Sequence, residues 1–393
     1  MNFLKGGVCI LSVAVPVLLF ELGLRVAREK MDYLAPERVA DPALGFRVAP
    51  YTGGHDEWGF RNLEVPESSE VVALGDSNTW GVAARWDESW PSEFARKTGR
   101  SVYNLGMSAY GPVEYFHLLE TKALSLKPDL VVVALYFGND FIDAYRSVSD
   151  RRHWASFRTR SMAPSGGQQE PTDFHPGAPF VNHRDAKKNP IKRLRNWLRG
   201  HSMLFRIIEE GPLGQRVNAW GDQREEFGGR RCAVRVEDPF TTVLQPDHRL
   251  AGLDLEDPKV EEGIELSLLF LEKIARLVEV HGSELRVVLI PTKESVLVRK
   301  AKDVRSGCEE IIQKILTNEE AIRQRVRAFL DEQRIPFVDT FEALREHALG
   351  HRIYLQSGDS HPNGEGYAVI AEEVAAATES HGSARKTPSR EAR

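Results

Sequence analysis

The chain has 393 residues, with 52 Lys and Arg against 57 Asp and Glu, which gives a formal net charge of −5. A protein held to nucleic acid by bulk positive charge is therefore excluded, and no nucleic-acid partner is expected. Hydrophobic residues make up 41% and charged residues 28% of the chain, and these proportions exclude a wholly disordered, collagenous or polytopic membrane protein. One elaborated globular domain is expected.

The N-terminal segment is apolar enough to address the chain to a membrane. Residues 6–20 carry no charge, and the ELGLRVAREK stretch behind them offers no small-residue cleavage site. We therefore predict that residues 1–30 form an uncleaved signal anchor, a transmembrane helix that places the rest of the protein outside the cytoplasm. Three basic residues follow the span and one precedes it, so the charges leave its orientation open.

The three cysteines, Cys9, Cys232 and Cys308, are too far apart for a disulfide scaffold or a Cys-x-x-Cys metal site. A zinc site is therefore not expected. Cys9 lies in the apolar segment without a small-residue lipobox before it, so Cys232 and Cys308 are the candidates for one disulfide of an exported chain. Two unrelated thiols are the alternative.

Residues 31–69 are rich in Pro, Gly and aromatic residues and contain Gly-Phe-Arg twice, which predicts a loop-rich lead-in. Three apolar runs without polar alternation follow, as expected for strands buried on both faces. They occupy residues 71–74, 102–105 and 130–136, and helical patterns at residues 90–97 and 113–127 separate them. This βαβαβ order predicts a parallel sheet with right-handed crossovers.

The pattern breaks after Asp143 and resumes near residue 262, so residues 144–261 are predicted to be an insertion in a domain of residues 70–379. Inside it, apolar residues recur at helical spacing among basic ones. They are Ile191, Leu194, Trp197, Leu198, Phe205 and Ile208. A helix packed on the domain is favoured, and a membrane-surface or substrate-lid helix is the alternative.

The α/β pattern then returns and runs to the end of the domain. Helices are predicted over residues 264–280, 319–333 and 365–377, and strands over residues 285–290 and 336–339. The polar tail, residues 380–393, is predicted to be disordered.

Polar residues follow the carboxyl ends of three predicted strands, at the edge of a parallel sheet where ligands bind. Ser77 lies in GDSNT, Gly106 in NLG and Asn139 in GND. A serine here can act as a nucleophile, and the N–H groups of Ser77 and Gly106 with the Asn139 amide suit an oxyanion. Each stretch alone is also typical of turns and helix caps.

A serine nucleophile needs a base, and the base needs an acceptor that fixes its tautomer. Asp359 and His361 lie two residues apart in DSHPN, near the end of the chain. The Asp359 carboxylate can hold one ring nitrogen of His361 while the other faces Ser77, provided that the two ends of the chain meet.

With these four blocks in order, the chain resembles the SGNH/GDSL hydrolase superfamily. The resemblance spans residues 70–143 and 262–377, and the Gly-Phe-Arg lead-in with PDLVVV before GND is similar to its membrane-anchored bacterial branch. It implies an α/β fold, a flavodoxin-like three-layer αβα sandwich, and no metal or other cofactor.

The resemblance also implies the roles of the site residues. Ser77 corresponds to the nucleophile, Gly106 and Asn139 to oxyanion donors, and His361 to the base. Asp359 corresponds to the family's acidic residue, although many members place it three residues before the histidine. Asn78 stands where the family often has a larger apolar residue.

The function implied is a serine esterase that hydrolyses acyl esters, short-chain or O-acetyl, in the periplasm or at the cell surface. The alternatives are an O-acetyltransferase of an extracytoplasmic polysaccharide and a non-catalytic carbohydrate-binding assembly factor.

Lys293 is expected to be a solvated lysine at the same edge of the sheet as Ser77, with contact to an anionic substrate as the alternative. Aromatic residues that could line the pocket are Trp80, Tyr110, Tyr136, Phe137, Phe141 and Tyr145.

Overall fold

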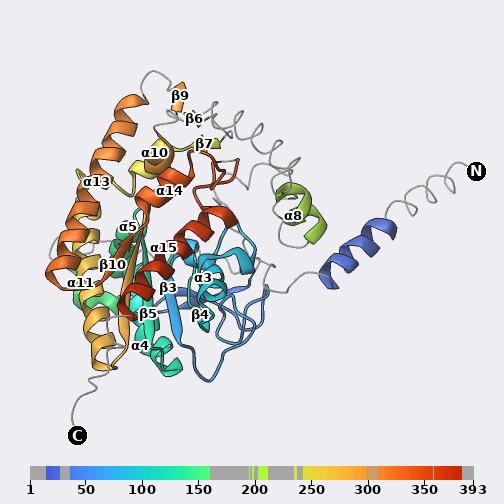
Figure 1. Cartoon of the computed structure of the whole chain (residues 1–393), viewed down its shortest axis with the longest axis horizontal. Helices are drawn as coiled ribbons and strands as arrows, with labels where there is room; N and C mark the ends of the chain where they lie inside the picture. Colours follow the sequence, from blue (N-terminus) through green and yellow to red (C-terminus); the bar gives the residue numbers. More distant parts are fainter. Residues whose placement is uncertain are drawn as a thin grey trace, which may run out of the picture.

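The computed structural model describes residues 15–26, 36–159, 194, 197–198, 202–210, 234–236, 242–298, 301–303, 308–356 and 358–382. Its centre is a five-stranded sheet in which every neighbouring pair of strands is parallel (Figure 1). The strands are β3 (Val71–Gly75), β4 (Val102–Asn104), β5 (Leu130–Tyr136), β8 (Glu284–Ile290) and β10 (Phe337–Asp339). Their spatial order is β10-β8-β5-β3-β4. Counted along the chain this is 2-1-3-4-5, the flavodoxin-like order, and the predicted α/β fold class is confirmed.

The two faces of the sheet carry separate cores, because successive side chains of a strand point to opposite faces. Every residue of β3 and β5 is buried. Val72 and Leu74 pack in one apolar cluster, and Val71 and Ala73 pack in the other. The first cluster is covered by α4 (Pro112–Thr121), α5 (Asp140–Asp150), α11 (Pro258–Val280) and α13 (Glu309–Glu332). The second is covered by α3 (Trp90–Thr98), α12 (Lys293–Leu297), α14 (Phe341–His347) and α15 (Gly364–Gly382).

Helix boundaries depart from the sequence pattern where caps and breaks decide them. The helix predicted over residues 113–127 divides into α4 and a 3₁₀ turn, Ala123–Leu126. Helix α11 begins at Pro258, because the Asp257 side chain accepts the N–H of Lys259 and proline suits a first turn. Helix α13 begins at Glu309 rather than at residue 319.

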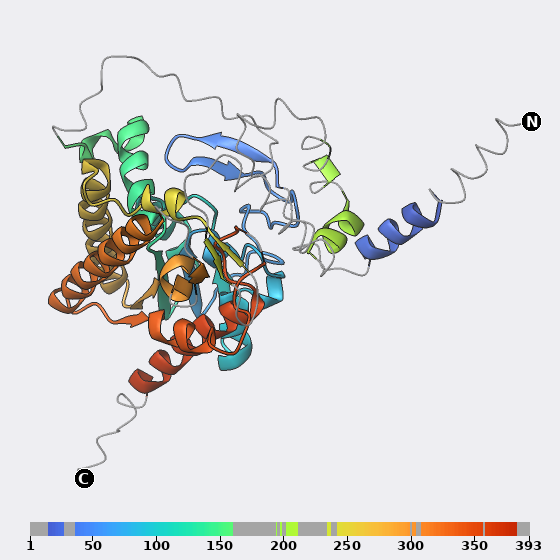
Figure 2. The ribbon, with the colours of Figure 1, turned by 90° about the horizontal axis from the view of Figure 1, so that it is seen from above.

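Two small antiparallel sheets were not predicted. The lead-in forms a hairpin of β1 (Arg38–Asp41) and β2 (Gly45–Val48), which contains the first Gly-Phe-Arg (Figure 2). The second sheet has the order β7-β6-β9 and joins the end of the insertion to a segment after β8. Its strands are β6 (Val234–Val236), β7 (Thr242–Leu244) and β9 (Ala301–Asp303). Short helix α10 (Pro246–Leu250) follows β7.

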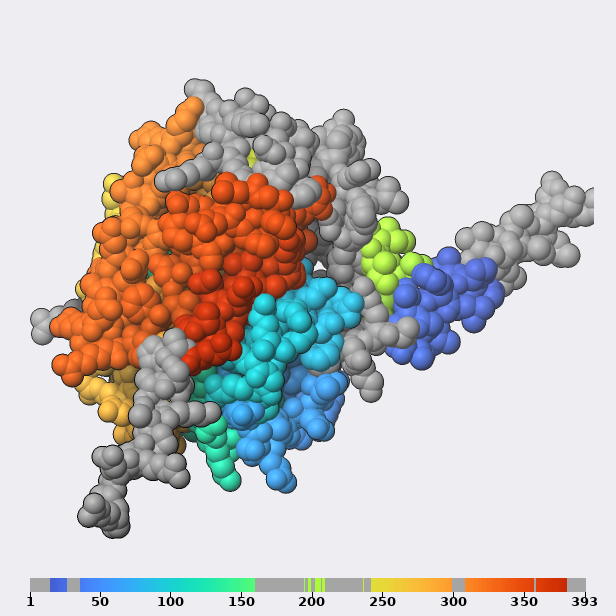
Figure 3. Space-filling model, viewed as in Figure 1, coloured from blue at the N-terminus to red at the C-terminus, as the bar shows by residue number. Residues whose placement is uncertain are grey.

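The N-terminal helix lies beside part of the insertion (Figure 3) and away from the sheet (Figure 1). Residues 15–26 are helical, and the Glu21 carboxylate accepts the N–H groups of Met203 and Leu204 at the start of α8 (Met203–Glu210). Across the described ranges, no helix is long and apolar enough to span a membrane. Residues 1–14 and 27–30 of the predicted anchor and residues 31–35 of the predicted lead-in lie outside the described residues, as do Ile191 and the tail beyond residue 382.

Candidate active site

The serine stands where β3 turns into the one-turn helix α2 (Ser77–Trp80). Asp76 caps this helix, because its Oδ1 atom accepts the N–H of Asn78 at 2.8 Å. Gly75 leaves room for the turn, since a Cβ there would lie 2.0 Å from Oγ1 of Thr79. Ser77 is 6% exposed, so its hydroxyl lies in a largely desolvated position at the carboxyl edge of the sheet.

A hydrogen-bonded chain joins this serine to the C-terminal block. Nε2 of His361 lies 2.7 Å from Oγ of Ser77, and Nδ1 lies 2.7 Å from Oδ1 of Asp359. The same carboxylate oxygen accepts the backbone N–H of His361 at 2.9 Å. The two-residue spacing thus lets Asp359 fix both the ring and the backbone of the histidine, and the structure brings the two ends of the chain together.

The pKa values of the pair follow from this contact. Burial alone would raise the pKa of Asp359, but the charge and hydrogen bonds of His361 hold it at about 2. Burial alone would lower the pKa of His361, but the Asp359 carboxylate raises it above its ordinary value. The arrangement therefore favours an imidazolium next to a carboxylate, the state in which a base holds a proton taken from serine.

Asp76 is a second carboxylate at the serine, and the sequence reasoning missed it. Its Oδ2 atom lies 3.2 Å from Oγ of Ser77, and its two oxygens accept the side-chain amide of Asn78 at 3.1 Å. Complete burial raises its pKa. Asn78, which departs from the apolar residue common in the family, thus supplies hydrogen bonds to a buried carboxylate.

The predicted oxyanion donors are placed differently. Ser77 N–H has no acceptor among the described residues. The side-chain amide of Asn139 donates to Asp143 at 2.6 Å, which leaves its second N–H. Gly106 N–H donates to Oδ1 of Asn104 at 2.8 Å and is therefore occupied.

The need for glycine at position 106 is steric in this structure. A Cβ on Gly106 would lie 2.4 Å from the backbone nitrogen of Trp80. The loop after β4 therefore approaches the serine helix more closely than any side chain would permit. Asn104 adds to this contact, since its amide donates to the carbonyl of Thr79 at 2.8 Å.

Arg61, from the second Gly-Phe-Arg, holds the other end of the serine helix. It is buried, and its guanidinium donates to the carbonyls of Trp80, Gly81 and Ala84. The Trp80 and Gly81 carbonyls lie at the C-terminal end of α2, where a short helix leaves carbonyls unsatisfied. The repeated tripeptide was noted in the sequence, but this role was not predicted from it.

Lys293 is not the solvated residue that we expected. Its side chain is 1% exposed, and its ammonium donates to the backbone carbonyl of Asp359 at 2.8 Å. Its charge also helps to lower the pKa of Asp359. Lys293 therefore supports the loop that carries Asp359 and His361.

The expected aromatic pocket lining is wrong for most of its members. Trp80 donates to Nε2 of His55, and Tyr110 donates to the carbonyl of Phe46. Phe137 and Phe141 pack in the core. Tyr136 is 3% exposed and belongs to the opposite core, while Tyr145 is partly buried against the first.

A cavity of about 310 Å³ lies between the lead-in and α4. Ser77 and His361 do not contribute to it. Its lining includes Arg47, Trp58, Met107, Tyr110, His117 and Lys122.

Cys308 is buried and disulfide-bonded, and its partner lies outside the described residues. This bond favours the predicted disulfide over the alternative of two unrelated thiols. Cys308 immediately precedes α13.

One family of known proteins is similar to part of the chain. Residues 71–164 match the sequence model of the GDSL-like lipase/acylhydrolase family. No curated protein matches the chain.

Solved structures with similarity to the chain include three esterases or lipolytic proteins. A lipolytic protein of the G-D-S-L family from Desulfitobacterium hafniense is 12% identical, with 79% of this chain and 99% of that chain covered and a TM-score of 0.38. An extracellular lipase from Streptomyces rimosus is 12% identical, with 80% and 99% covered and a TM-score of 0.38. A mutant acetyl-xylooligosaccharide esterase from Geobacillus stearmophilus is 11% identical, with 84% and 99% covered and a TM-score of 0.37.

The family match begins at the first residue of β3 and includes the serine turn, the loop after β4 and the Asn139 loop. The part of the chain that carries Ser77, Gly106 and Asn139 is therefore similar to the GDSL-like lipases and acylhydrolases, a family of ester hydrolases.

Proposed function

We propose that the chain is a serine esterase for short acyl esters. Ser77 is its nucleophile and His361 is its general base. The Asp359 carboxylate orients the imidazole. The observation that carries the proposal is the continuous hydrogen-bonded chain from Ser77 Oγ through the imidazole to the Asp359 carboxylate. A neutral imidazole in this position can accept the serine proton, and the carboxylate stabilises the imidazolium that results.

The reaction has two stages, the acylation of Ser77 and the hydrolysis of the acyl-enzyme. Ser77 Oγ attacks the ester carbonyl as His361 takes its proton, and the tetrahedral oxyanion is stabilised by the Ser77 N–H and the Asn139 amide. The intermediate then expels the alcohol, which receives the proton from His361, and an acyl-enzyme remains. Water then attacks the acyl group while His361 accepts one proton of the water. The carboxylic acid leaves, and His361 returns this proton to Ser77 Oγ.

A small acyl group, such as acetyl, is the substrate that we favour. Apolar side chains close in sequence to the serine and to the Asn139 loop are used in the core or tied by hydrogen bonds, as Trp80 and Phe141 are. They are therefore not free to line a channel for a long acyl chain.

We also propose that this domain acts outside the cytoplasm, held at a membrane by its N-terminal segment. The apolar residues 6–20 support this placement. So does the disulfide of Cys308, because disulfides persist in oxidising compartments. Leu194, Trp197 and Ile208 are each more than half exposed, which suits contact with a membrane surface. Fractionation of cells and protease accessibility of the full chain would test this; recovery of the chain in the soluble cytoplasmic fraction would overturn it.

The esterase proposal is tested by Ser77→Ala in the full chain, assayed with p-nitrophenyl acetate. We expect the burst of nitrophenol and the turnover to be lost, because no acyl-enzyme forms, while the circular dichroism spectrum is unchanged. Ser101→Ala, at the opposite end of β4, is the matched control and should retain wild-type activity. Wild-type turnover by Ser77→Ala would refute the proposal.

The acyl acceptor is settled by a second measurement on the same enzyme. Acetate release into water and acetyl transfer to an added polysaccharide are followed together. Release that is unaffected by the glycan supports the hydrolase, whereas efficient transfer at the expense of release makes the protein an acetyltransferase.

A further inference from the structure

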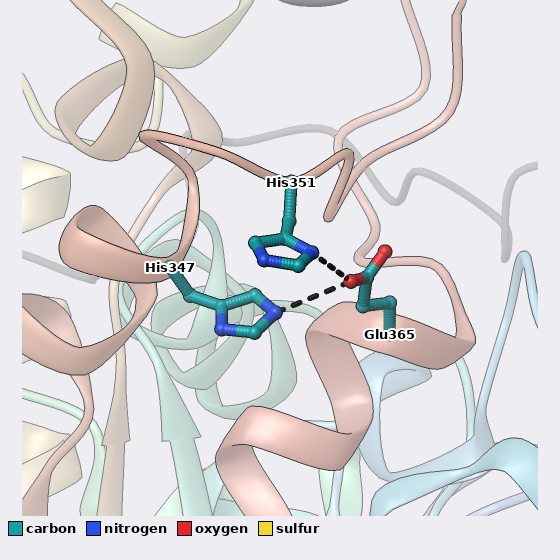
Figure 4. A group of neighbouring side chains, drawn as sticks. All are labelled: His347, His351 and Glu365. Carbon is teal, nitrogen blue, oxygen red and sulfur yellow. Dashed lines mark hydrogen bonds and ion pairs between the residues drawn. The ribbon is translucent and has the colours of Figure 1, made fainter.

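Two histidines and a glutamate converge on one point near the base of the loop that carries Asp359 and His361 (Figure 4). Nδ1 of His351 lies 2.6 Å from Oε1 of Glu365, and Nε2 of His347 lies 3.3 Å from the same oxygen. The two rings are stacked, with centroids 4.3 Å apart and planes 21° apart. Both rings thus direct a nitrogen, rather than a carbon edge, toward the carboxylate.

The donor atoms suit a divalent transition-metal ion. All three lie within 4.8 Å of one another. Zinc binds imidazole nitrogen and carboxylate oxygen at about 2.0–2.2 Å, which sets the separation of two ligand atoms in a tetrahedron at about 3.3 Å. The His347–Glu365 separation already has this value. The His351–Glu365 contact must open by about 0.7 Å to reach the tetrahedral separation, and the Glu365 side chain, 43% exposed, is free to move.

The charge around the cluster does not oppose a cation. Among the described residues, the Glu365 carboxylate forms no ion pair with Lys or Arg, and its ionic contacts are the two imidazoles. The nearby guanidinium of Arg345 is paired with Glu342. Imidazole nitrogen with one carboxylate selects zinc, copper or nickel over magnesium and calcium, which prefer all-oxygen sites.

The cluster also joins the two ends of the loop that carries Asp359 and His361. His347 ends α14, and His351 begins the segment that pairs with residues 361–363. In that pairing, Asn363 N–H donates to the Ile353 carbonyl at 3.0 Å, and the Asn363 amide donates to the Arg352 carbonyl at 2.7 Å. Glu365 follows at the start of α15. An ion held by all three side chains would therefore close the base of the loop.

We propose that His347, His351 and Glu365 form a zinc site, completed by water, that fastens the base of the loop carrying Asp359 and His361. The site is distinct from the serine centre, and the proposal does not depend on the esterase reaction. Its role is to hold the ends of the loop together, in the manner of a structural clamp.

Zinc binding is measured by competition with a chromogenic chelator on the full chain after treatment with EDTA. We expect one ion for each wild-type chain. His347→Ala, His351→Ala and Glu365→Gln should each weaken binding by at least about 10- to 100-fold, the loss that even outer-shell partners of a metal produce. His281→Ala is the matched control, because His281 is exposed and its ring contacts the Leu277 carbonyl of its own helix.

Two further measurements test the coordination and its effect. Cobalt substituted for zinc should give the intense visible absorption of a four-coordinate ion, and His347→Ala should abolish it. Zinc should slow amide hydrogen exchange in residues 352–363 of the wild type and not in the variants. The proposal is overturned if no zinc binds, or if the double variant His347→Ala/His351→Ala binds it as tightly as the wild type; it is also overturned if bound zinc leaves exchange in that loop unchanged.

Discussion

At the scale of single residues, His361 is controlled by carboxylates on two sides. Asp359 holds one ring nitrogen, and the buried Asp76 also raises the pKa of the imidazole. As a base, the ring must be neutral before Ser77 attacks. Activity in the wild type should therefore rise with pH through a midpoint above 6.5, the ordinary histidine value.

Replacement of the acid tests this control. Asp359→Asn should move the midpoint of kcat/KM against pH downward, because it removes the main charge that stabilises the imidazolium. It should also lower the plateau by roughly 10²–10⁴-fold, since an amide no longer fixes the required tautomer. A plateau within a factor of two of the wild type, with an unshifted midpoint, would exclude Asp359 from the site.

The same pair makes folding stability depend on pH. The lowered pKa of Asp359 contributes stability above its unfolded value of about 3.9, which is lost as pH falls toward 2. The raised pKa of His361 contributes stability below about 6.5, which is lost as pH rises through the folded value. Urea unfolding of wild type and Asp359→Asn should therefore differ most near pH 5–6, where both groups are charged in either state.

Lys293 acts on the same loop without touching the serine. Lys293→Met removes the donor to the Asp359 carbonyl and a buried positive charge. We expect kcat to fall by about tenfold or more with a smaller change in KM, in line with about 1.5–3 kcal/mol for a charged hydrogen bond. The kcat/KM midpoint should also shift, because a cation near Asp359 is lost.

Lys259→Met, at an exposed position, is the control for Lys293. If Lys293→Met lowers only the melting temperature and leaves both kcat and the pH midpoint of kcat/KM intact, Lys293 supports the fold alone. A loss of kcat together with the shifted midpoint identifies it as a positioning residue.

At the scale of elements, the short helix α2 is held by tight contacts that a single methyl group would disturb. Gly106→Ala would place a Cβ against the backbone of Thr79 and Trp80, 2.4–2.5 Å away. Backbone cannot rotate aside as a side chain can, so α2 and Ser77 must shift. We expect a stability loss of about 1–3 kcal/mol from overpacking, together with reduced kcat.

Gly350→Ala is the matched control for this substitution. A Cβ at Gly350 would meet nothing within 4 Å. The stability and turnover of Gly350→Ala should therefore equal those of the wild type. Both variants are compared by urea unfolding and by hydrolysis of p-nitrophenyl acetate. Equal stability for Gly106→Ala would show that the close approach is not required.

The elements that the sequence predicted well are those that bury side chains on both faces. The apolar run at residues 130–136 coincides with β5 because each of its residues enters one of the two cores. The hairpin of β1 and β2 was missed because its strands are only four residues long and partly exposed. Helix α11 begins at a proline that follows an aspartate cap, and α13 begins directly after the buried Cys308. The apolar period reports neither start.

At the scale of the whole molecule, the site could be predicted because parallel strands deliver their carboxyl ends to one edge. Ser77 and Asn139 follow β3 and β5, which are neighbours in the sheet, so their approach follows from topology. The supporting contacts of Asp76, Arg61 and Lys293 depend on side-chain direction, which spacing does not specify. Lys293 shows the difference, since the sequence placed it at the correct edge but in solvent.

Within the described residues, a buried ion pair helps to join the end of the insertion to the edge of the sheet. Arg249, on α10, contacts Oε2 of Glu294 at 3.2 Å and donates to the Gly138 carbonyl at 2.7 Å. Both side chains are 6% exposed. The pair therefore connects the segment after β7, the start of α12 and the loop that carries Asn139.

Removal of one partner should be costly because it leaves the other charge buried. We expect Arg249→Met to lower the free energy of unfolding by about 3–5 kcal/mol, and Arg249→Met/Glu294→Gln to restore part of it, because the amide carries no charge. Arg325→Met, which breaks an exposed pair with Glu261, should cost less than about 1 kcal/mol. Urea unfolding of the full chain measures all three. An equal loss of unfolding free energy for the buried and exposed pairs would show that α10 is not held to the sheet by charge. A larger loss for the buried pair, together with slower turnover in Arg249→Met, would show that this contact also positions the Asn139 loop.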